Sequence, residues 1–152
     1  MSDQNHKNAY ELREQIRTFV QLFGLHEQHQ TPCGQPLTVP HAHALMVLLE
    51  EDGLRIAELG EHLNIDKSNV SRLCARMDEA GHLERRPCSE DARAKRLWLT
   101  NEGRELAGRV NQASIGRFSQ IVARVEDTEV EQIVGALELL NNSLIRSVQE
   151  DK

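Results

Sequence analysis

One run of polar side chains has the composition of a surface that reads DNA bases. The segment from Asp66 to Gly81 begins at a helix-capping aspartate, carries apolar residues at helical spacing and stops at a glycine, so it predicts a helix. The N-terminal half of such a helix is the part that reaches base edges when the helix lies in a major groove. The side chains available for these contacts are Lys67, Ser68, Asn69, Ser71 and Arg72, with Arg76 one turn further on.

Each of these residue types suits a particular group on DNA. An asparagine can pair bidentately with adenine and an arginine with guanine, so Asn69 and Arg72 are the predicted sequence readers. Ser68 and Ser71 are short enough to serve phosphates or bases equally. The competing interpretation is that all of them are solvated residues of an ordinary surface helix, and the neighbouring segments favour the DNA-reading one.

A charged hairpin is predicted to follow this helix. Two short runs of strand-like residues, 82–87 and 96–100, flank a polar tip at 88–95. Arg93 and Lys95 lie in this tip, where an arginine can enter the narrow, electronegative minor groove beside the major groove. Asp91 can accept hydrogen bonds from turn amides or from the guanidinium, so its predicted role is to fix the shape of the tip.

The segment upstream supplies a supporting helix. Residues 55–64 carry apolar residues on one helical face and end at Asn64, which can adopt the left-handed turn conformation. A tight connection at residues 65–66 then presents the second helix outward. The predicted fold is a winged helix-turn-helix: mainly α (α+β), with a small β-hairpin wing, flanked by N- and C-terminal dimerisation helices.

Long amphipathic helices are predicted on both sides of this module. An apolar stripe from Leu12 to Phe23 predicts a first helix over about residues 8–28, and two more stripes follow residue 100. The module is too small to cover these faces, so a homodimer is favoured over a monomer that folds them back on itself. A two-fold dimer would set its recognition helices about 34 Å apart and predicts a palindromic operator.

The predicted organisation is one integrated domain with three parts. These are an N-terminal dimerisation helix and linker at 1–37, the DNA-binding module at 38–100 and C-terminal dimerisation helices at 101–152.

Charge is distributed unevenly along the chain. The 152 residues carry a net charge of -6, yet residues 66–96 hold eight Lys/Arg against six Asp/Glu, a balance of +2. The remainder therefore sums to -8, so a positive face can meet phosphates while the acidic part points away. Because there is no run of about 18 apolar residues and the sequence begins with a polar stretch, we expect a cytoplasmic protein with no membrane partner.

The wing and the exposed helix resemble those of the MarR-type transcriptional regulators. The resemblance lies in the wing sequence DARAKRLWLT at 91–100, preceded by LERRP at 83–87, and in the helix sequence KSNVSRL at 67–73, and it extends over nearly all the chain. It implies a homodimer that represses or activates genes and responds to a small molecule or to oxidation. Two departures are visible: Arg55 stands where the family often has a small hydroxyl residue, and residues 30–36 form a longer connection than in many members.

The most unusual local composition surrounds Thr38, which can cap the second helix. Histidines and a cysteine gather within 18 residues, at His26, His29, Cys33, His41 and His43. Imidazole and thiolate are good zinc ligands, but the spacing matches no defined site, and polar surface histidines are the competing interpretation. Cys33 alone suggests oxidation sensing through a sulfenic acid.

An organic effector is the favoured signal. The family resemblance implies a site for it in the gap between the dimerisation helices and the winged module. The residues available to line that site are Phe23, His41, Leu45 and Met46.

Three cysteines without a CxxC pair fit a reducing compartment rather than a disulfide framework. Of the two outside the histidine-rich segment, Cys74 is predicted to be a small core residue and Cys88, at the start of the wing tip, to be exposed.

No motif in the sequence points to catalysis. There is no Gly-rich phosphate loop, no HExxH, no GxSxG and no distinctive pair of carboxylates, so we expect neither an enzyme nor a cofactor. The predicted function is sequence-specific regulation of transcription on double-stranded DNA, with repression favoured. A metal- or redox-responsive regulator and a winged helix used for protein-protein contact remain the alternatives.

Overall fold

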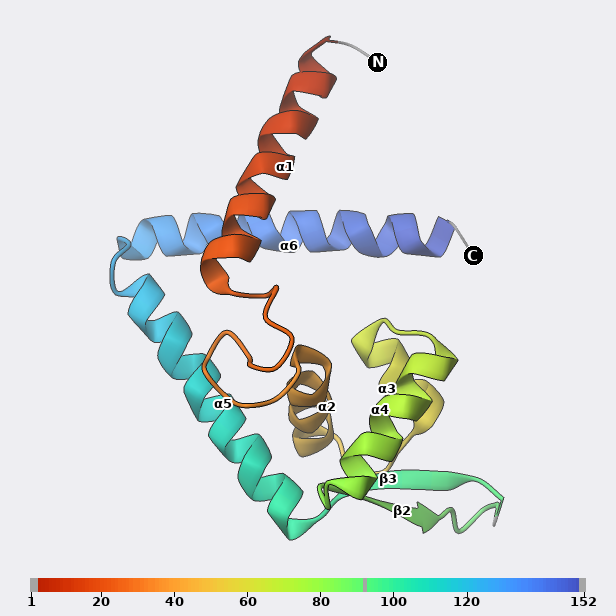
Figure 1. The fold of residues 1–152 in the computed structure, drawn as a ribbon. Coiled ribbons are helices and arrows are strands. Elements are labelled where there is room, and N and C mark those ends of the chain that lie inside the picture. Colours follow the sequence, from red (N-terminus) through yellow and green to blue (C-terminus); the bar gives the residue numbers. More distant parts are fainter. Residues whose placement is uncertain (1–2, 92, 151–152) are drawn as a thin grey trace. The chain divides into compact units, whose positions relative to one another are not determined.

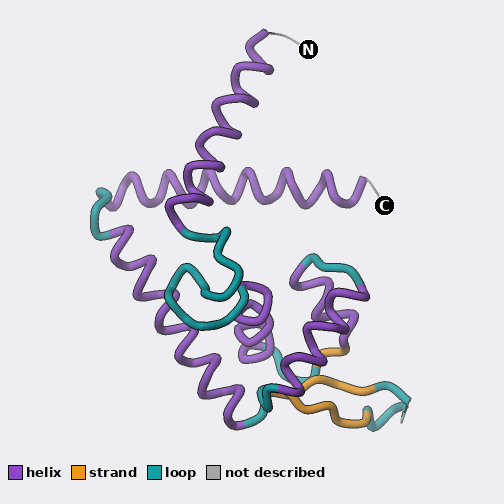
Figure 2. The backbone as a smooth tube through the Cα atoms, viewed as in Figure 1, coloured by secondary structure: helices purple, strands orange, loops and turns teal. Residues whose placement is uncertain are grey.

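The computed structural model describes residues 3–91 and 93–150 and has a mainly helical fold with one small sheet (Figures 1 and 2). The helices are α1 (Asp3–Phe23), α2 (Val39–Glu50), α3 (Ile56–Leu63), α4 (Lys67–Glu79), α5 (Asn101–Val122) and α6 (Asp127–Glu150). The strands are β1 (Leu54–Arg55), β2 (Leu83–Pro87) and β3 (Lys95–Leu99). The chain divides into two compact units, Met1–Ser114 and Ile115–Lys152.

The first unit is built on a hydrophobic core contributed by α2, α3, α4, the sheet and the beginning of α5. Its largest fully buried side chains include Leu45, Leu48, Leu59, Met77 and Leu97. Burial of one such side chain contributes about 1.5–3 kcal/mol, so this core fixes the orientation of α4 and of the strands that follow it. The predicted winged helix-turn-helix is confirmed.

The turn between α3 and α4 has the geometry that the sequence predicts. Asn64 adopts the left-handed conformation at φ 52°, and the N–H of Ile65 donates to the carbonyl oxygen of Gly60 at 3.0 Å. A Cβ atom on Gly60 would lie 3.2 Å from a methyl carbon of Val70, so the two helices cross closely at this glycine. The crossing leaves the opposite face of α4 uncovered.

The sheet contains one strand more than predicted. Its order is β1-β3-β2, antiparallel throughout, with Leu54 opposite Leu97 and Arg55 opposite Arg96. The hairpin of β2 and β3 was predicted, but β1 was not, because two residues are too short to show an alternating pattern. Figure 1 shows the hairpin extending away from the C-terminal end of α4.

The first helix differs from the predicted range of 8–28. It begins five residues earlier, at Asp3, and ends at Phe23 because Gly24 adopts a positive φ of 90°. The N–H groups of Gly24 and Leu25 both donate to the carbonyl oxygen of Val20, each at 3.2 Å, which closes the last turn. The apolar stripe alone did not reveal the stop at this glycine.

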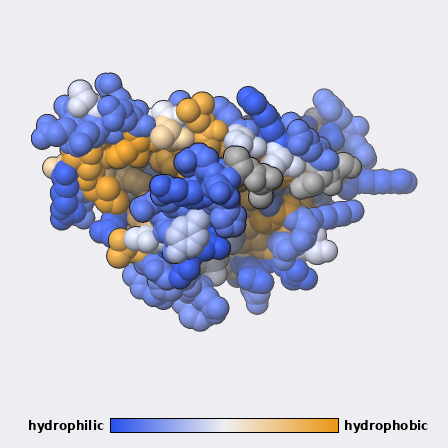
Figure 3. Space-filling model, turned by 90° about the horizontal axis from the view of Figure 1, so that it is seen from above, coloured by the Kyte–Doolittle hydropathy of each residue, from blue (hydrophilic) through white to orange (hydrophobic). Residues whose placement is uncertain are grey.

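Helices α1 and α6 have exposed apolar side chains and no buried residue within their described lengths. The large exposed ones are Tyr10, Leu12, Ile16, Phe19 and Leu22 on α1, and Ile133, Val134, Leu137, Leu139, Leu144, Ile145 and Val148 on α6. Figure 3 shows uncovered hydrophobic side chains on the face that it presents. Among the described residues, no helix is both long enough and apolar enough to span a bilayer.

Candidate nucleic-acid interface

Helix α4 has one buried face and one polar face. Its buried residues are Val70, Leu73, Cys74 and Met77, which pack into the core. All six DNA contacts predicted on this helix are exposed: Lys67, Ser68, Asn69, Ser71, Arg72 and Arg76. The separation follows from the helical period, because the apolar side chains recur at spacings of three and four.

Three polar side chains form a chain at the start of α4. Asp66 caps the helix, with Oδ1 accepting from the backbone N–H of Asn69 at 2.8 Å. The Nδ2 of Asn69 donates to Asp66 Oδ2 at 2.8 Å, and its Oδ1 accepts from Nη2 of Arg72 at 2.6 Å. Both ends of the Asn69 amide are therefore engaged, whereas Arg72 keeps donors for another partner.

Two hydrogen bonds donated by backbone N–H groups lie beside the cations of the wing tip. The backbone N–H of Cys88 donates to the carbonyl oxygen of Ala94 at 2.8 Å and closes the loop. Asp91 Oδ1 accepts from the N–H of Arg93 at 2.9 Å, which is the kind of turn contact suggested for that carboxylate. Arg93 and Lys95 are exposed, and neither has an ion-pair partner within residues 3–91 and 93–150.

A row of arginines that the sequence pattern does not predict crosses the sheet. Arg96 on β3 lies opposite Arg55 on β1 and opposite Arg86 on β2. The guanidinium of Arg86 lies 4.7 Å from the ring centre of Trp98 and also pairs with Glu84. The row depends on strand register, which the sequence pattern did not specify because β1 was missed.

The proposed metal ligands do not form a cluster. Among the described residues, no group of three or more His, Cys, Asp or Glu side chains is arranged to hold a metal ion. His26, His29 and His43 are exposed, and the thiol of Cys33 lies 3.0 Å from the hydroxyl of Thr31. The prediction that Cys88 is exposed is wrong: its relative exposure is 6%, because it is enclosed at the base of the wing tip.

The residues suggested for an effector site have different surroundings. Leu45 is fully buried in the core, so packing accounts for it, and Met46 is half-buried against that core. Phe23 stacks on Phe19 with ring centres 5.1 Å apart. His41 is half-buried on α2, where packing leaves part of its ring accessible.

His41 has a polar partner far away in sequence. Its Nε2 lies 3.1 Å from Nδ1 of His82, the residue just before β2. Burial lowers the pKa of His41, and the nearby His82 and Arg76 lower it further. The pair therefore links α2 to the base of the wing most stably while His41 is neutral.

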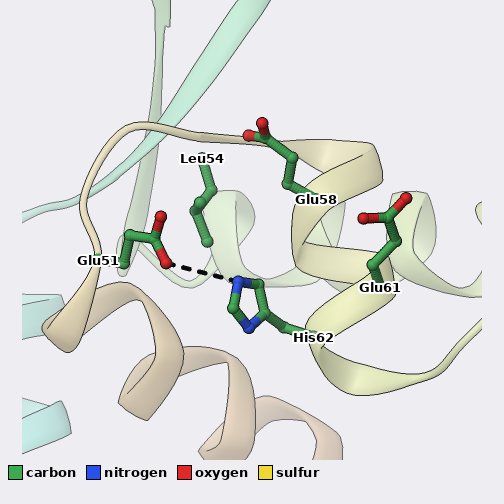
Figure 4. Close-up of a pocket in the computed structure, with 5 residues that line it drawn as sticks. All are labelled: Glu51, Leu54, Glu58, Glu61 and His62. Carbon is green, nitrogen blue, oxygen red and sulfur yellow. Dashed lines mark ion pairs between the residues drawn. The ribbon is translucent and has the colours of Figure 1, made fainter.

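An acidic pocket of about 380 Å³ lies between the end of α2 and α3 (Figure 4). It is lined by Glu51, Leu54, Glu58, Glu61 and His62. Nε2 of His62 lies 3.5 Å from Oε2 of Glu51, and Glu58 also accepts from the backbone N–H of Arg55 at 2.7 Å. The three carboxylates repel phosphate, so the pocket itself disfavours an anionic ligand.

Sequence comparison finds relatives among transcriptional regulators. The sequence model of the MarR family matches residues 35–94. The HTH-type transcriptional regulator TtmR of Methylorubrum extorquens is 36% identical over 75 residues, which are 49% of this chain and 38% of that protein. The organic hydroperoxide resistance transcriptional regulator of Bacillus subtilis is 31% identical over 67 residues, which are 44% of this chain and 46% of that protein. The chain thus spans less than half the length of these two relatives.

Structural comparison extends the similarity to nearly the whole chain. The crystal structure of Streptococcus pneumoniae FabT in complex with DNA has a TM-score of 0.73 and a sequence identity of 16%. The match covers 95% of this chain and 99% of the FabT chain. At this identity the match establishes the shared fold.

Proposed function

Because this chain belongs to the MarR family of winged helix-turn-helix proteins, we propose that it binds duplex DNA as a homodimer and represses transcription in the cytoplasm. The observation that carries the proposal is the combination of an exposed polar helix face with a cationic wing tip in one module. A major-groove helix and a minor-groove finger are the two elements that such a module needs. The FabT structure, which has this fold, contains DNA.

In this proposal α4 reads bases mainly through Arg72. Its guanidinium has free donors that match the two acceptors of guanine, and Asn69 orients it through the 2.6 Å hydrogen bond. Asn69 keeps one amide hydrogen and one lone pair of Oδ1 beyond its contacts with Asp66 and Arg72, so it is the second proposed base reader and also orients Arg72. The phosphate contacts of this helix come from Lys67, Ser68, Ser71 and Arg76.

The wing supplies the second contact. Arg93 enters the minor groove and Lys95 neutralises a neighbouring phosphate, while Asp91 holds the backbone of the turn. Both cations are free of ion pairs among the described residues, so binding DNA breaks no existing pair at these positions.

Dimer formation is supported by the apolar side chains left exposed on α1 and α6. Phe19 is 47% exposed and Leu144 is 54% exposed, and a second copy of the chain would remove such surface from water. We accordingly propose that segments 1–37 and 101–152 contribute to dimerisation, while Leu106, Ala107 and Val110 of α5 pack into the core of the module. A two-fold axis then gives two recognition helices about 34 Å apart on a palindromic site.

Regulation by a small organic effector completes the proposal. An effector that binds better to a dimer with wrongly spaced recognition helices would weaken DNA binding. The loss of DNA-binding free energy cannot exceed the difference in the effector's binding free energy between the two dimer conformations. The proposed effector contacts are Phe23, His41 and Met46, because each of these residues is partly exposed. The metal-responsive alternative has no ligand cluster to support it among the described residues.

Removal of the wing cations distinguishes DNA binding from protein-protein contact. The probe is a duplex enriched from a random-sequence pool by the full chain. Arg93→Ala combined with Lys95→Ala should weaken binding and reduce the slope of log affinity against log salt by about 0.9 for each phosphate that the protein no longer neutralises. A matched control removes two other exposed cations that form no ion pair among the described residues, Arg109 and Arg146, and should leave the slope nearly unchanged. Unchanged affinity in the wing variant would instead favour a winged helix that binds a protein.

The same assay tests base reading by α4. Arg72→Ala should weaken binding to the enriched duplex by about 1–3 kcal/mol and leave binding to a scrambled duplex much less affected. An equal reduction on both duplexes would assign Arg72 to phosphate contact. Circular dichroism would verify that the helical content of the variant is unchanged.

A further inference from the structure

Arg96 is held inside the wing rather than extended into solvent. It lies on the central strand β3, between Arg55 on β1 and Arg86 on β2. The side chain is half-buried, unlike the exposed cations of the tip. A guanidinium in this position has hydrogen-bond donors that protein atoms must satisfy.

Two contacts engage two of those donors, and they join distant parts of the module. Nη1 of Arg96 donates to the backbone carbonyl oxygen of Gly53 at 2.8 Å, and Nε donates to Sγ of Cys88 at 3.5 Å. Gly53 precedes β1, whereas Cys88 is the first residue after β2. One side chain therefore connects the entry to the sheet with the base of the wing tip.

The sulfur of Cys88 is a shared acceptor at the base of the tip. The hydrogen bond from Arg96 lowers the pKa of Cys88, and hydrogen bonds from the backbone N–H groups of Glu90 and Asp91 lower it further. Asp91 in turn accepts from the N–H of Arg93. A continuous set of contacts thus runs from Gly53 to the residue proposed to enter the minor groove.

The Gly53 end of this set is itself rigid. Gly53 has a positive φ of 77°, and a Cβ atom there would lie 3.1 Å from the indole of Trp98. Its N–H donates to the carbonyl oxygen of Leu97 at 3.0 Å. The carbonyl that receives Arg96 is therefore fixed by β3 and by the adjacent aromatic ring.

We propose that Arg96 is a positioning residue for DNA binding, which acts through Cys88 to hold the wing tip at a fixed place relative to α4. The inference rests on the proposed function. A hairpin tip without this attachment would sample many orientations, and ordering it on DNA would cost affinity. Two of its five N–H donors are directed toward Gly53 and Cys88, and the proposal assigns Arg96 no DNA contact of its own.

A double-mutant cycle tests whether Arg96 acts through the tip. Arg96→Lys keeps the charge but lacks the planar fork that spans both acceptors, so affinity for the enriched duplex should fall about tenfold. In a chain that already carries Arg93→Ala and Lys95→Ala, the same substitution should have little further effect. A full tenfold decrease in that background would mean that Arg96 contacts DNA directly, and would overturn the proposal. Arg86→Lys, on the neighbouring strand, is the matched control and should bind as the wild type does.

The acceptor is tested by two substitutions of Cys88. Cys88→Ser keeps a hydrogen-bond acceptor and should retain wild-type affinity, whereas Cys88→Ala removes it and should reproduce the weaker binding of Arg96→Lys. Equal affinities for the serine and alanine variants would contradict the role of the sulfur.

Hydrogen exchange on the free full-length chain gives a readout that needs no DNA. In Arg96→Lys the amides of Glu90, Asp91 and Arg93 should exchange faster, while those of α4 are unchanged. Unchanged exchange at the tip would refute the positioning role even if DNA binding is established. Faster exchange in a protein that binds no duplex would refute the proposed function and leave the attachment of the tip supported.

Discussion

Two glycines on α5 offer a matched test of how tightly that helix packs against the base of the wing. Gly103 lies in the first turn, and a Cβ atom built on it would be 2.1 Å from the carbonyl oxygen of His82. Gly108 is one and a half turns further along, and no described atom lies within 4 Å of its Cβ position. The same substitution, Gly→Ala, therefore meets backbone at one position and open space at the other.

The magnitude of the effect follows from two opposing terms. Alanine is favoured over glycine within a helix by about 1 kcal/mol at either position. At Gly103 the new methyl group must move by about 1 Å or more to reach an ordinary contact distance, against a backbone carbonyl that cannot rotate away. Overpacking of this kind costs about 1–3 kcal/mol and occasionally more. Gly108→Ala should therefore be slightly stabilised, and Gly103→Ala should be destabilised by about 2 kcal/mol.

Urea denaturation followed by circular dichroism measures both variants. All measurements need the same protomer concentration, because dimer formation would couple stability to concentration. We expect the two unfolding free energies to differ by about 3 kcal/mol, with Gly103→Ala the less stable. If the two variants unfold within about 0.5 kcal/mol of each other, α5 does not approach His82 as closely as the structure requires.

Two further predictions concern the base of the wing. Because burial, His82 and Arg76 lower the pKa of His41 below 6.5, the unfolded chain takes up this proton first as the pH falls. The stability that neutral His41 contributes is present above pH 6.5 and is lost as the pH falls toward the pKa of His41 in the folded state. Between pH 7 and 5 the unfolding free energy of His41→Gln should therefore decrease less than that of the wild type. Thr100 donates to the carbonyl oxygen of Gly81 at 2.6 Å and accepts from the N–H of Gly103 at 3.0 Å, so Thr100→Val should cost about 1–2 kcal/mol in urea denaturation.

Each of these predictions has an internal control. His43 is exposed on the same helix as His41, and His43→Gln should keep the wild-type pH dependence. If the slopes of the two variants coincide, the pH dependence does not come from the half-buried imidazole of His41. Thr100→Ser keeps the hydroxyl and should unfold close to the wild type. A valine variant as stable as the serine variant would show that neither hydrogen bond matters.

Local chemistry was sufficient to predict the helix-turn-helix. The side chains of Asp66 and Thr100 cap helices by accepting hydrogen bonds from backbone N–H groups three residues further along the chain. Asn64 adopts its left-handed conformation in the short connection between α3 and α4. The exposed face of α4 follows from the positions of its apolar residues. These features depend on contacts between residues close in sequence, so composition and spacing carry the information. Gly24, which ends α1, is also visible in the sequence, but an apolar stripe alone does not indicate that a helix stops there.

Contacts between distant residues were decided only by the tertiary structure. Strand β1 exists because it pairs with β3, and its two residues have no pattern of their own. Arg96 reaches a carbonyl 43 positions away, and His41 meets an imidazole 41 positions away. Cys88 becomes buried because the strands bring Arg96 and the tip amides to it. Such contacts depend on strand register and on helix packing around a shared core, which no single segment of the sequence specifies.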